Sequence, residues 1–382
     1  MMTLAPEELV ALVRSVFPRF ETDQALAILV DVPRDASLDN PAWKERRRLA
    51  AEWFALLDAR KAEIPLAEVK LVAYPDVGSN NADLPARGFL LDGPMADVAA
   101  ELEPVGKPIG FEEVFASTQL FLAPTEYSTT APLKNAAKRF LFRAATMPGF
   151  AAEMIPALRI DYGEVARRVD ALKKRLDEAD HADVDFIVDG KSEYGIHFDL
   201  RHRQAHSSSG RFPELGTAGN LPSGEAYIVP YEGEQNEASR TAGILPVEID
   251  GEMVFFTIQA NRAVAVDGDG PAAQDERAHL AAEPAYGNMA ELGFGVLADF
   301  GLEPIGEILL DEKLGLHVAF GRSDHFGGAV GPRDFSSPAA VIHLDRIYIP
   351  QSQPRIAVRS VTLGYPGGRS ERIMADGAYT IF

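Results

Sequence analysis

The sequence has no cysteine among its 382 residues, and this absence removes a whole set of chemistries. Disulfides, thiolate metal sites, iron–sulfur clusters and cysteine nucleophiles all need sulfur that no other side chain supplies. Basic residues are also few, since 37 Lys and Arg stand against 57 Asp and Glu and leave a net charge of −20. Because a field of this sign repels phosphate backbones and anionic lipid headgroups, we expect neither a nucleic-acid nor a membrane partner.

Long apolar runs are missing as well. The longest uninterrupted apolar stretch near the start, Ala25–Val30, is far shorter than the ~20 residues that a membrane span needs. The first twenty residues do not show a basic leader, an apolar block and a small-residue cleavage site in succession. We therefore expect a cytoplasmic protein without a membrane-spanning helix.

The first part of the chain predicts an α/β domain over residues 1–180. Ala25–Val32 is a compact apolar run closed by Pro33, which is typical of a buried strand in a parallel sheet. Asn40 is placed to cap a long helix that begins at Pro41, and Thr3 to cap an opening helix. Three further helices are expected, over residues 131–146, 149–158 and 161–179.

The remaining residues, 181–382, predict an α+β domain built on a mixed or antiparallel sheet. Short β-rich segments follow one another here with glycine and proline between them. Helices are expected only near residues 272–282 and 288–299, and residues 307–310 are expected to form a strand. Gly293-x-Gly295-x-x-Ala298 fits a loose dinucleotide-binding pattern, but residues 288–292 are not expected to form the buried strand that this motif requires.

Histidine and acidic residues in this second domain are the candidates for chemistry. His343 and Asp345 are two residues apart in a strand-like run, so both side chains lie on one face and can share a metal ion. His317 interrupts the apolar run Leu316–Phe320, and Glu225 and Glu291 follow turn-rich or small-residue segments. Taken singly, each of these residues is explained at least as well as an ordinary surface or core residue as it is as a metal ligand.

Together, these residues resemble the thermophilic metallo-aminopeptidases, the aminopeptidase T family. The resemblance covers roughly residues 145–350, and its segments occur in the family's order: Ser209-Gly210-Arg211-Phe212-Pro213, Asn220-Leu221-Pro222-Ser223-Gly224-Glu225, Asn288 to Gly293, Asp311-Glu312-Lys313 with His317-Val318-Ala319-Phe320-Gly321, and His343-Leu344-Asp345. It implies an aminopeptidase T-like fold and a homodimer that acts on short peptides or related amides.

The same resemblance implies one or two divalent ions, zinc, cobalt or manganese. The positions that would bind them are Glu225, Glu291, His317, His343 and Asp345, with Glu225 also catalytic. A metal pair activates water and stabilises the oxyanion that forms when an amide is attacked.

Two departures from the family pattern affect the expected site. Asp324 stands where the family has a tyrosine, and Gly224 stands where it has the first of two successive glutamates. We therefore include Asp324 as a candidate metal ligand and catalytic residue, and Arg322 and His325 as candidates for binding an anionic part of the substrate. A solvated loop explains Arg322, Asp324 and His325 equally well.

Two other functions remain open. Distant members of the fold resemble dihydroxypyridine ring-cleaving dioxygenases, which use one iron(II) ion held by two histidines and a carboxylate. That branch has a histidine at the position of Glu291, and the acid in this chain favours hydrolysis. A binding protein that keeps the scaffold without turnover is the third possibility.

Overall fold

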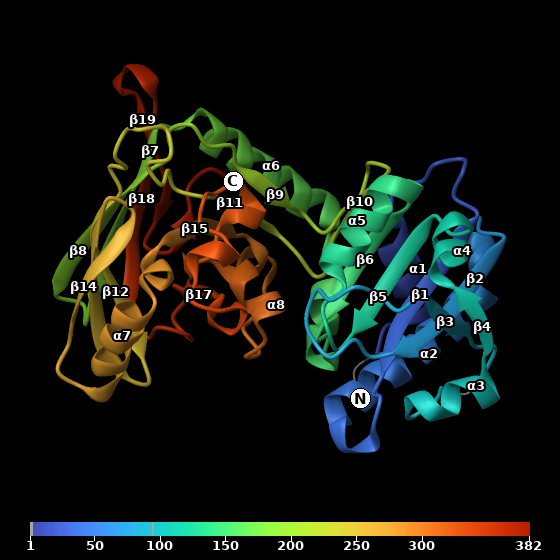
Figure 1. Cartoon of the computed structure of the whole chain (residues 1–382). Helices are drawn as coiled ribbons and strands as arrows, with labels where there is room; N and C mark the ends of the chain where they lie inside the picture. Colours follow the sequence, from blue (N-terminus) through green and yellow to red (C-terminus); the bar gives the residue numbers. More distant parts are fainter. Residues whose placement is uncertain (1–2, 94) are drawn as a thin grey trace. The chain divides into compact units, whose positions relative to one another are not determined.

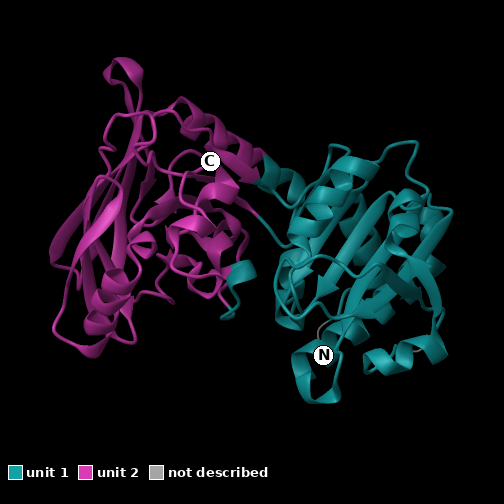
Figure 2. Ribbon diagram, viewed as in Figure 1, with its two compact units in different colours: residues 1–166, 208–223, 305–310 teal, residues 167–207, 224–304, 311–382 magenta. Residues whose placement is uncertain are grey.

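The computed structural model describes residues 3–93 and 95–382, which form two compact units (Figure 2). Unit 1 comprises Met1–Ala166, Ser208–Ser223 and Ile305–Leu310, and unit 2 comprises Arg167–Ser207, Gly224–Pro304 and Asp311–Phe382. The boundary therefore lies inside helix α6 (Tyr162–Glu178), not near residue 180 where we expected it. The apolar stripe of α6 continues across the boundary without a glycine or proline, so the sequence carries no local signal there.

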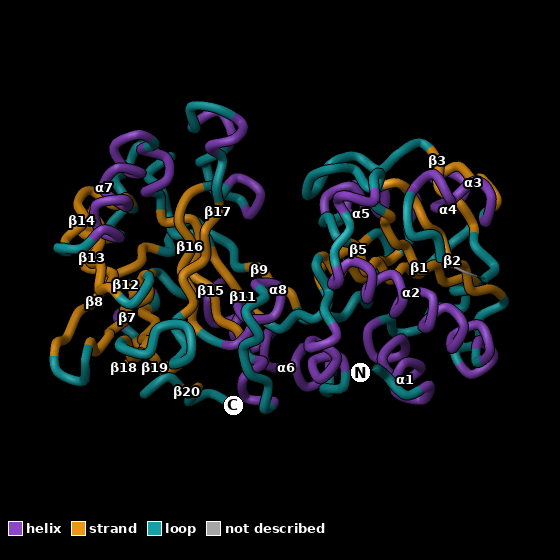
Figure 3. Tube along the Cα trace, turned by 90° about the horizontal axis from the view of Figure 1, so that it is seen from below, coloured by secondary structure: helices purple, strands orange, loops and turns teal. Residues whose placement is uncertain are grey.

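Unit 1 is built on a seven-stranded sheet with the order β10-β6-β5-β1-β2-β3-β4. Its strands are β1 (Ala25–Val32), β2 (Glu68–Pro75), β3 (Arg87–Leu90), β4 (Lys107–Gly110), β5 (Leu120–Thr125), β6 (Arg143–Pro148) and β10 (Thr217–Asn220). The strands from β10 to β2 pair in parallel, and β3 and β4 pair antiparallel at the other end. Helices α1 (Pro6–Val16) and α2 (Pro41–Ala59) lie on one side of the strands and α4 (Phe111–Ala116) and α5 (Thr130–Phe140) on the other (Figure 3). The short helix α3 (Leu102–Val105) precedes β4.

Several local predictions for unit 1 are confirmed. Strand β1 has the predicted bounds, and all eight of its residues are buried because it lies between β2 and β5. Helix α2 begins at Pro41, and the Asn40 side chain accepts a hydrogen bond from the backbone N–H of Trp43 at 2.8 Å.

Other predictions for unit 1 are wrong. The residue before α1 is Ala5, whose N–H is bound by the Glu8 carboxylate, and the Thr3 hydroxyl instead donates to Glu52. The helix expected over residues 131–146 ends at Phe140, after which Leu141 adopts a left-handed conformation and β6 begins. The small residues of β6 carry no clear period of their own, so pairing with β5 decides their structure. Residues 152–158 form a 3-10 helix instead of an α-helix.

Unit 2 contains two sheets (Figure 1). The eight-stranded sheet has the order β14-β13-β12-β8-β7-β18-β19-β20. Its strands are β7 (His181–Val188), β8 (Ser192–Asp199), β12 (Ala242–Ile249), β13 (Glu252–Gln259), β14 (Arg262–Asp267), β18 (Ile356–Gly364), β19 (Ser370–Ala375) and β20 (Ala378–Tyr379). The five-stranded sheet has the order β17-β16-β15-β11-β9, with strands β9 (His206–Ser208), β11 (Glu225–Ile228), β15 (Met289–Gly295), β16 (Leu316–Gly321) and β17 (His343–Ile347). The helix α7 (Pro271–Ala282) was predicted within one residue.

The helix expected over residues 288–299 is wrong, and this correction matters for function. Residues 289–295 form β15, which is buried at every position between β11 and β16. Met, Ala, Glu and Leu favour a helix locally, but strand partners on both sides override that preference. The expectation that residues 288–292 form no buried strand is therefore wrong as well. The dinucleotide motif still fails, because Gly293 and Gly295 lie inside the strand and only a 3-10 helix of four residues, Leu297–Phe300, follows it. Residues 307–310, expected to form a strand, lie mostly in helix α8 (Ile308–Asp311).

None of the helices in the described part of the chain is long and apolar enough to cross a membrane.

Candidate metal centre

The five-stranded sheet of unit 2 places the predicted ligands on one face. Glu291 on β15 lies opposite Ala319 on β16, and Ala319 lies opposite Asp345 on β17. His317 lies two residues before Ala319, and His343 two residues before Asp345. Since directly opposite residues and residues two apart share a face, strand pairing brings these side chains together.

Two groups of ligand atoms result, and Glu291 belongs to both. In the first group, His317 Nε2 lies 3.5 Å from Glu225 Oε2 and 3.3 Å from Glu291 Oε1. In the second, His343 Nε2 lies 3.2 Å from Glu291 Oε2 and 3.7 Å from Asp345 Oδ1. The ligand atoms within each group lie within 4.8 Å of one another. The structure therefore assembles all five residues into one cluster, with each oxygen of Glu291 facing a different histidine.

Backbone carbonyls fix the tautomer of both histidines. His343 Nδ1 lies 2.8 Å from the carbonyl oxygen of Arg322, and His317 Nδ1 lies 3.3 Å from that of Gly315. Because a carbonyl oxygen can only accept, each Nδ1 carries the proton and donates it. Each Nε2 therefore faces the carboxylates. It donates a proton to Glu291 in the metal-free protein and would offer its lone pair to an ion that displaces that proton, which is the arrangement that metal-binding imidazoles need.

Gly293 makes room for the His317 ring. It lies opposite His317 on the neighbouring strand, and a Cβ built there would be only 1.9 Å from His317 Nε2. The ring thus lies directly over the glycine backbone. Any larger residue at position 293 forces the imidazole away from Glu225 and Glu291.

Lys313 is part of the centre, although our sequence reasoning treated it only as part of a family segment. Its ammonium donates to Glu225 Oε1 at 2.6 Å and also pairs with Glu312. The lysine side chain is almost fully buried. Its place just before β16, beside acidic residues and next to an apolar run, was the available signal for a buried ion pair.

The charge of the cluster favours a bound cation. Four carboxylates, those of Glu225, Glu291, Glu312 and Asp345, face one ammonium, that of Lys313, and two imidazoles. One negative charge remains when both histidines are protonated, as their raised pKa values favour, and three remain for a bound ion that takes the place of the two protons. Glu225 Oε2 is buried and has no hydrogen-bond partner among the described residues. Buried anionic charge is costly without compensation. Imidazole nitrogens with carboxylate oxygens suit zinc, manganese or iron, so the residues present fit a divalent metal ion.

The pKa shifts follow from burial and these pairs. Burial raises the pKa of Glu225, although the Lys313 charge opposes the change. Burial also raises the pKa of Glu312, to about 7. Burial would raise the pKa of Glu291 too, but hydrogen bonds from His317 and His343 outweigh it and lower that pKa. The same cluster of carboxylates raises the pKa of His317 to about 9 against the effect of burial.

The three loop residues predicted for catalysis or substrate binding, Arg322, Asp324 and His325, lie outside the cluster of five ligands. Asp324 Oδ1 accepts a hydrogen bond from Arg322 Nε at 2.5 Å, and Asp324 belongs to neither ligand group of the described chain. His325 packs its ring 5.2 Å from that of His343, and burial lowers its pKa to about 4, so it is neutral. Arg322 and His325 are therefore beside the second ligand group, whereas Asp324 is engaged by Arg322.

An aromatic wall that the sequence reasoning missed borders the second group. Tyr227, two residues after Glu225 on the same face of β11, packs 4.8 Å from Phe326, and Phe326 packs 5.5 Å from His343. These rings give the metal centre an apolar side on which a substrate side chain can pack.

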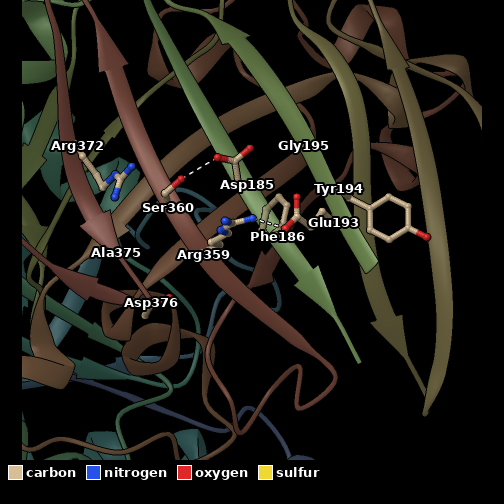
Figure 4. Close-up of a pocket in the computed structure, with 10 residues that line it drawn as sticks. All are labelled: Asp185, Phe186, Glu193, Tyr194, Gly195, Arg359, Ser360, Arg372, Ala375 and Asp376. Atoms are coloured by element: carbon tan, nitrogen blue, oxygen red, sulfur yellow. Dashed lines mark hydrogen bonds and ion pairs between the residues drawn. The ribbon is translucent and has the colours of Figure 1, made fainter. Parts of the chain in front are cut away.

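A polar cavity of about 560 Å³ lies elsewhere in unit 2, between strands β7, β8, β18 and β19 (Figure 4). In it, Ser360 donates to Asp185 at 2.7 Å and Arg359 pairs with Glu193. None of the five ligands lines this cavity, so its size does not make it the candidate active site.

Searches for sequence relatives give no result: no protein-family model and no curated protein matches the chain. Solved structures do match over the whole length. 2,5-Dihydroxypyridine dioxygenase from Pseudomonas putida is 15% identical, with a TM-score of 0.59, and covers 100% of this chain and 99% of its own. AmpT, the aminopeptidase T of Thermus thermophilus, is 13% identical, with a TM-score of 0.54, and 98% of each chain is covered.

The chain therefore has the aminopeptidase T-like fold, a mixed α/β architecture with several sheets. Both neighbours are enzymes, and identities of this size establish the fold alone.

Proposed function

We propose that this chain is a metal-dependent hydrolase of the aminopeptidase type, which releases N-terminal residues from short peptides or related amides. The observation that carries the proposal is the position of Glu291 between two ligand groups. Two ligand groups that share a carboxylate would suit two divalent ions held side by side, and paired ions are typical of aminopeptidases. The cofactor would be one or two divalent ions.

Divalent ions held by these residues would polarise the scissile carbonyl and lower the pKa of a water molecule. The chain itself supplies the remaining functions. Lys313 holds the Glu225 carboxylate in place through Oε1 and leaves Oε2 facing His317. Glu312, with a pKa of about 7, is suited to accept a proton from water and return it to the leaving amine. The negative charge of the cluster also suits a substrate with a free α-ammonium group.

The test combines metal analysis with turnover. Full-length protein is stripped with a chelator, reloaded with zinc, cobalt or manganese, and assayed on aminoacyl anilides and dipeptides. We expect cleavage that depends on metal and is lost in Glu291→Gln, which keeps the size of the side chain but removes its charge. Glu193→Gln, an exposed carboxylate on the other sheet, is the matched control. Metal binding without cleavage of either substrate class contradicts the proposal.

A ring-cleaving dioxygenase is the second candidate. His317 from the first ligand group, with His343 and Asp345 from the second, supplies two histidines and one carboxylate, the donor types of mononuclear iron(II) oxygenases. The match to the dihydroxypyridine dioxygenase structure also supports it. Anaerobic loading with iron(II), followed by oxygen uptake with 2,5-dihydroxypyridine, separates the two reactions. If neither assay responds while metal is bound, a binding function replaces both.

The expected homodimer and the cytoplasmic location belong to the same proposal. Sedimentation of the purified chain at several concentrations tests the dimer, and cell fractionation tests the location.

A further inference from the structure

A second group of metal-ligating side chains lies on the eight-stranded sheet. His181 and Asp183 are two residues apart on β7 and share a face, and His197 on β8 lies directly opposite Asp183. The intervening residues Ala182 and Val184 are buried in the core. The three polar side chains therefore project together from the face of β7 that turns away from the core.

Their donor atoms are spaced as a metal ion requires. His197 Nδ1 lies 2.8 Å from Asp183 Oδ1, and His181 Nε2 lies 3.6 Å from Asp183 Oδ2. All three donors lie within 4.8 Å of one another. Ligands about 2.0–2.2 Å from a tetrahedral zinc ion are about 3.3–3.6 Å apart, so small side-chain rotations are sufficient.

Gly364 on β18 provides the space for one of the rings. It lies opposite His181 on the side away from β8, and a Cβ there would be 2.0 Å from His181 Cε1 and 2.2 Å from Nε2. The imidazole therefore occupies the volume that any other residue at position 364 would fill. The glycine allows the His181 ring to lie beside that of His197, with the ring centroids 4.8 Å apart.

The group is open to solvent, unlike the buried centre. The side chains of His181, Asp183 and His197 are 36%, 48% and 35% exposed, so an ion can enter and water can complete its coordination. The next pair on the same face, Asp185 and Gly195, borders the polar cavity of Figure 4. With neutral imidazoles the group carries one negative charge, which a divalent ion compensates.

We propose that His181, Asp183 and His197 form a second metal site, which binds a zinc-type divalent ion and joins β7 to β8. The site is separate from the buried centre and does not depend on the proposed hydrolase activity. Binding to the folded state alone stabilises the protein by mass action, so zinc should raise its melting temperature through this site.

The test is a zinc titration of the full chain, stripped of metal, by equilibrium dialysis. His197→Asn and Asp183→Asn should each bind one zinc equivalent fewer than the unaltered protein. Gly364→Ala, which displaces the His181 ring, should weaken that equivalent at least tenfold. His202→Asn removes an exposed histidine from the same unit and should leave the stoichiometry unchanged.

Thermal unfolding of the metal-free variants checks that they are folded. His197→Asn and Asp183→Asn should fold because these side chains are half-exposed, and the melting temperature of Gly364→Ala shows whether this change at a buried glycine is tolerated. Glu291→Gln, which affects the buried centre, should retain the zinc bound at the second site. If His197→Asn, Asp183→Asn and Gly364→Ala bind as many zinc ions as the unaltered protein, with the same dissociation constants, the second site does not exist.

Discussion

Gly293 gives the sharpest test of the buried centre, because it controls a ligand without being one. The Cβ of Gly293→Ala would lie 1.9 Å from His317 Nε2, whereas ordinary van der Waals contact begins at 3.4 Å. The ring must therefore retreat by about 1.5 Å. Metal–ligand distances tolerate only about 0.2 Å, so His317 is lost as a ligand.

We expect the loss to weaken metal binding roughly 10–100-fold, which corresponds to about 1.4–2.8 kcal/mol. Competition with a chromophoric chelator measures the dissociation constant directly. Ala319→Gly, at the position opposite Glu291 on β16, removes a methyl group from the same face of the sheet and adds none, so it is the control. Overpacking can also destabilise the strand by about 1–3 kcal/mol, so the melting temperature of the metal-free variant is measured beside it.

A double-mutant cycle separates the two effects. In an His317→Ala background the overlap is relieved, and Gly293→Ala should cause no further loss of metal affinity. Unaltered binding in the single variant, or an equal further loss in the double variant, refutes the reasoning that the glycine acts through the His317 ring.

Three further predictions concern charged groups. Lys313→Met leaves Glu225 and Glu312 without their shared cation. It should lower the free energy of unfolding of the metal-free protein by roughly 3–5 kcal/mol, as measured by chemical denaturation. Addition of a divalent ion should restore part of that free energy, and no recovery would contradict the charge argument. Glu312→Gln removes the proposed proton acceptor and should lower kcat of the metal-loaded enzyme at least 100-fold without changing its metal content. If the variant loses bound metal in proportion to its activity, Glu312 is a metal ligand instead. Burial raises the pKa of Asp31 to about 6, above its ordinary value of 3.8, so the folded state holds a proton between these values that the unfolded state has lost. The free energy of unfolding should therefore fall by about 2 kcal/mol as the pH rises from 4 to 6, and urea titrations should show no such fall in Asp31→Asn.

Local patterns in the sequence were sufficient where a segment's own residues decide its structure. The apolar run of β1 and the Asn40-Pro41 start of α2 specify a buried strand and a capped helix without reference to distant residues. The same holds for His343 and Asp345, because a period of two puts both on one face once a strand forms.

Local patterns were insufficient for Glu291 and Asp324. Residues 289–292 favour a helix locally, and only pairing with β11 and β16 makes them part of a strand that presents Glu291 to two histidines. Asp324 was a candidate ligand by position, but the nearby guanidinium of Arg322 holds its carboxylate. Neither outcome is encoded in the neighbouring residues alone.

The sequence by itself determined which chemistry is available to this protein: acids and imidazoles, with no sulfur ligands from cysteine, in a β-rich second half. The tertiary structure decided which of those groups meet. Side-chain alternation is a local property of the backbone, whereas the distance between Glu225, Glu291 and Asp345 depends on the register of strands that are far apart in the chain. The same long-range register places Lys313 against Glu225 and Gly293 beneath His317, so the charge and the shape of the centre exist only in the folded chain.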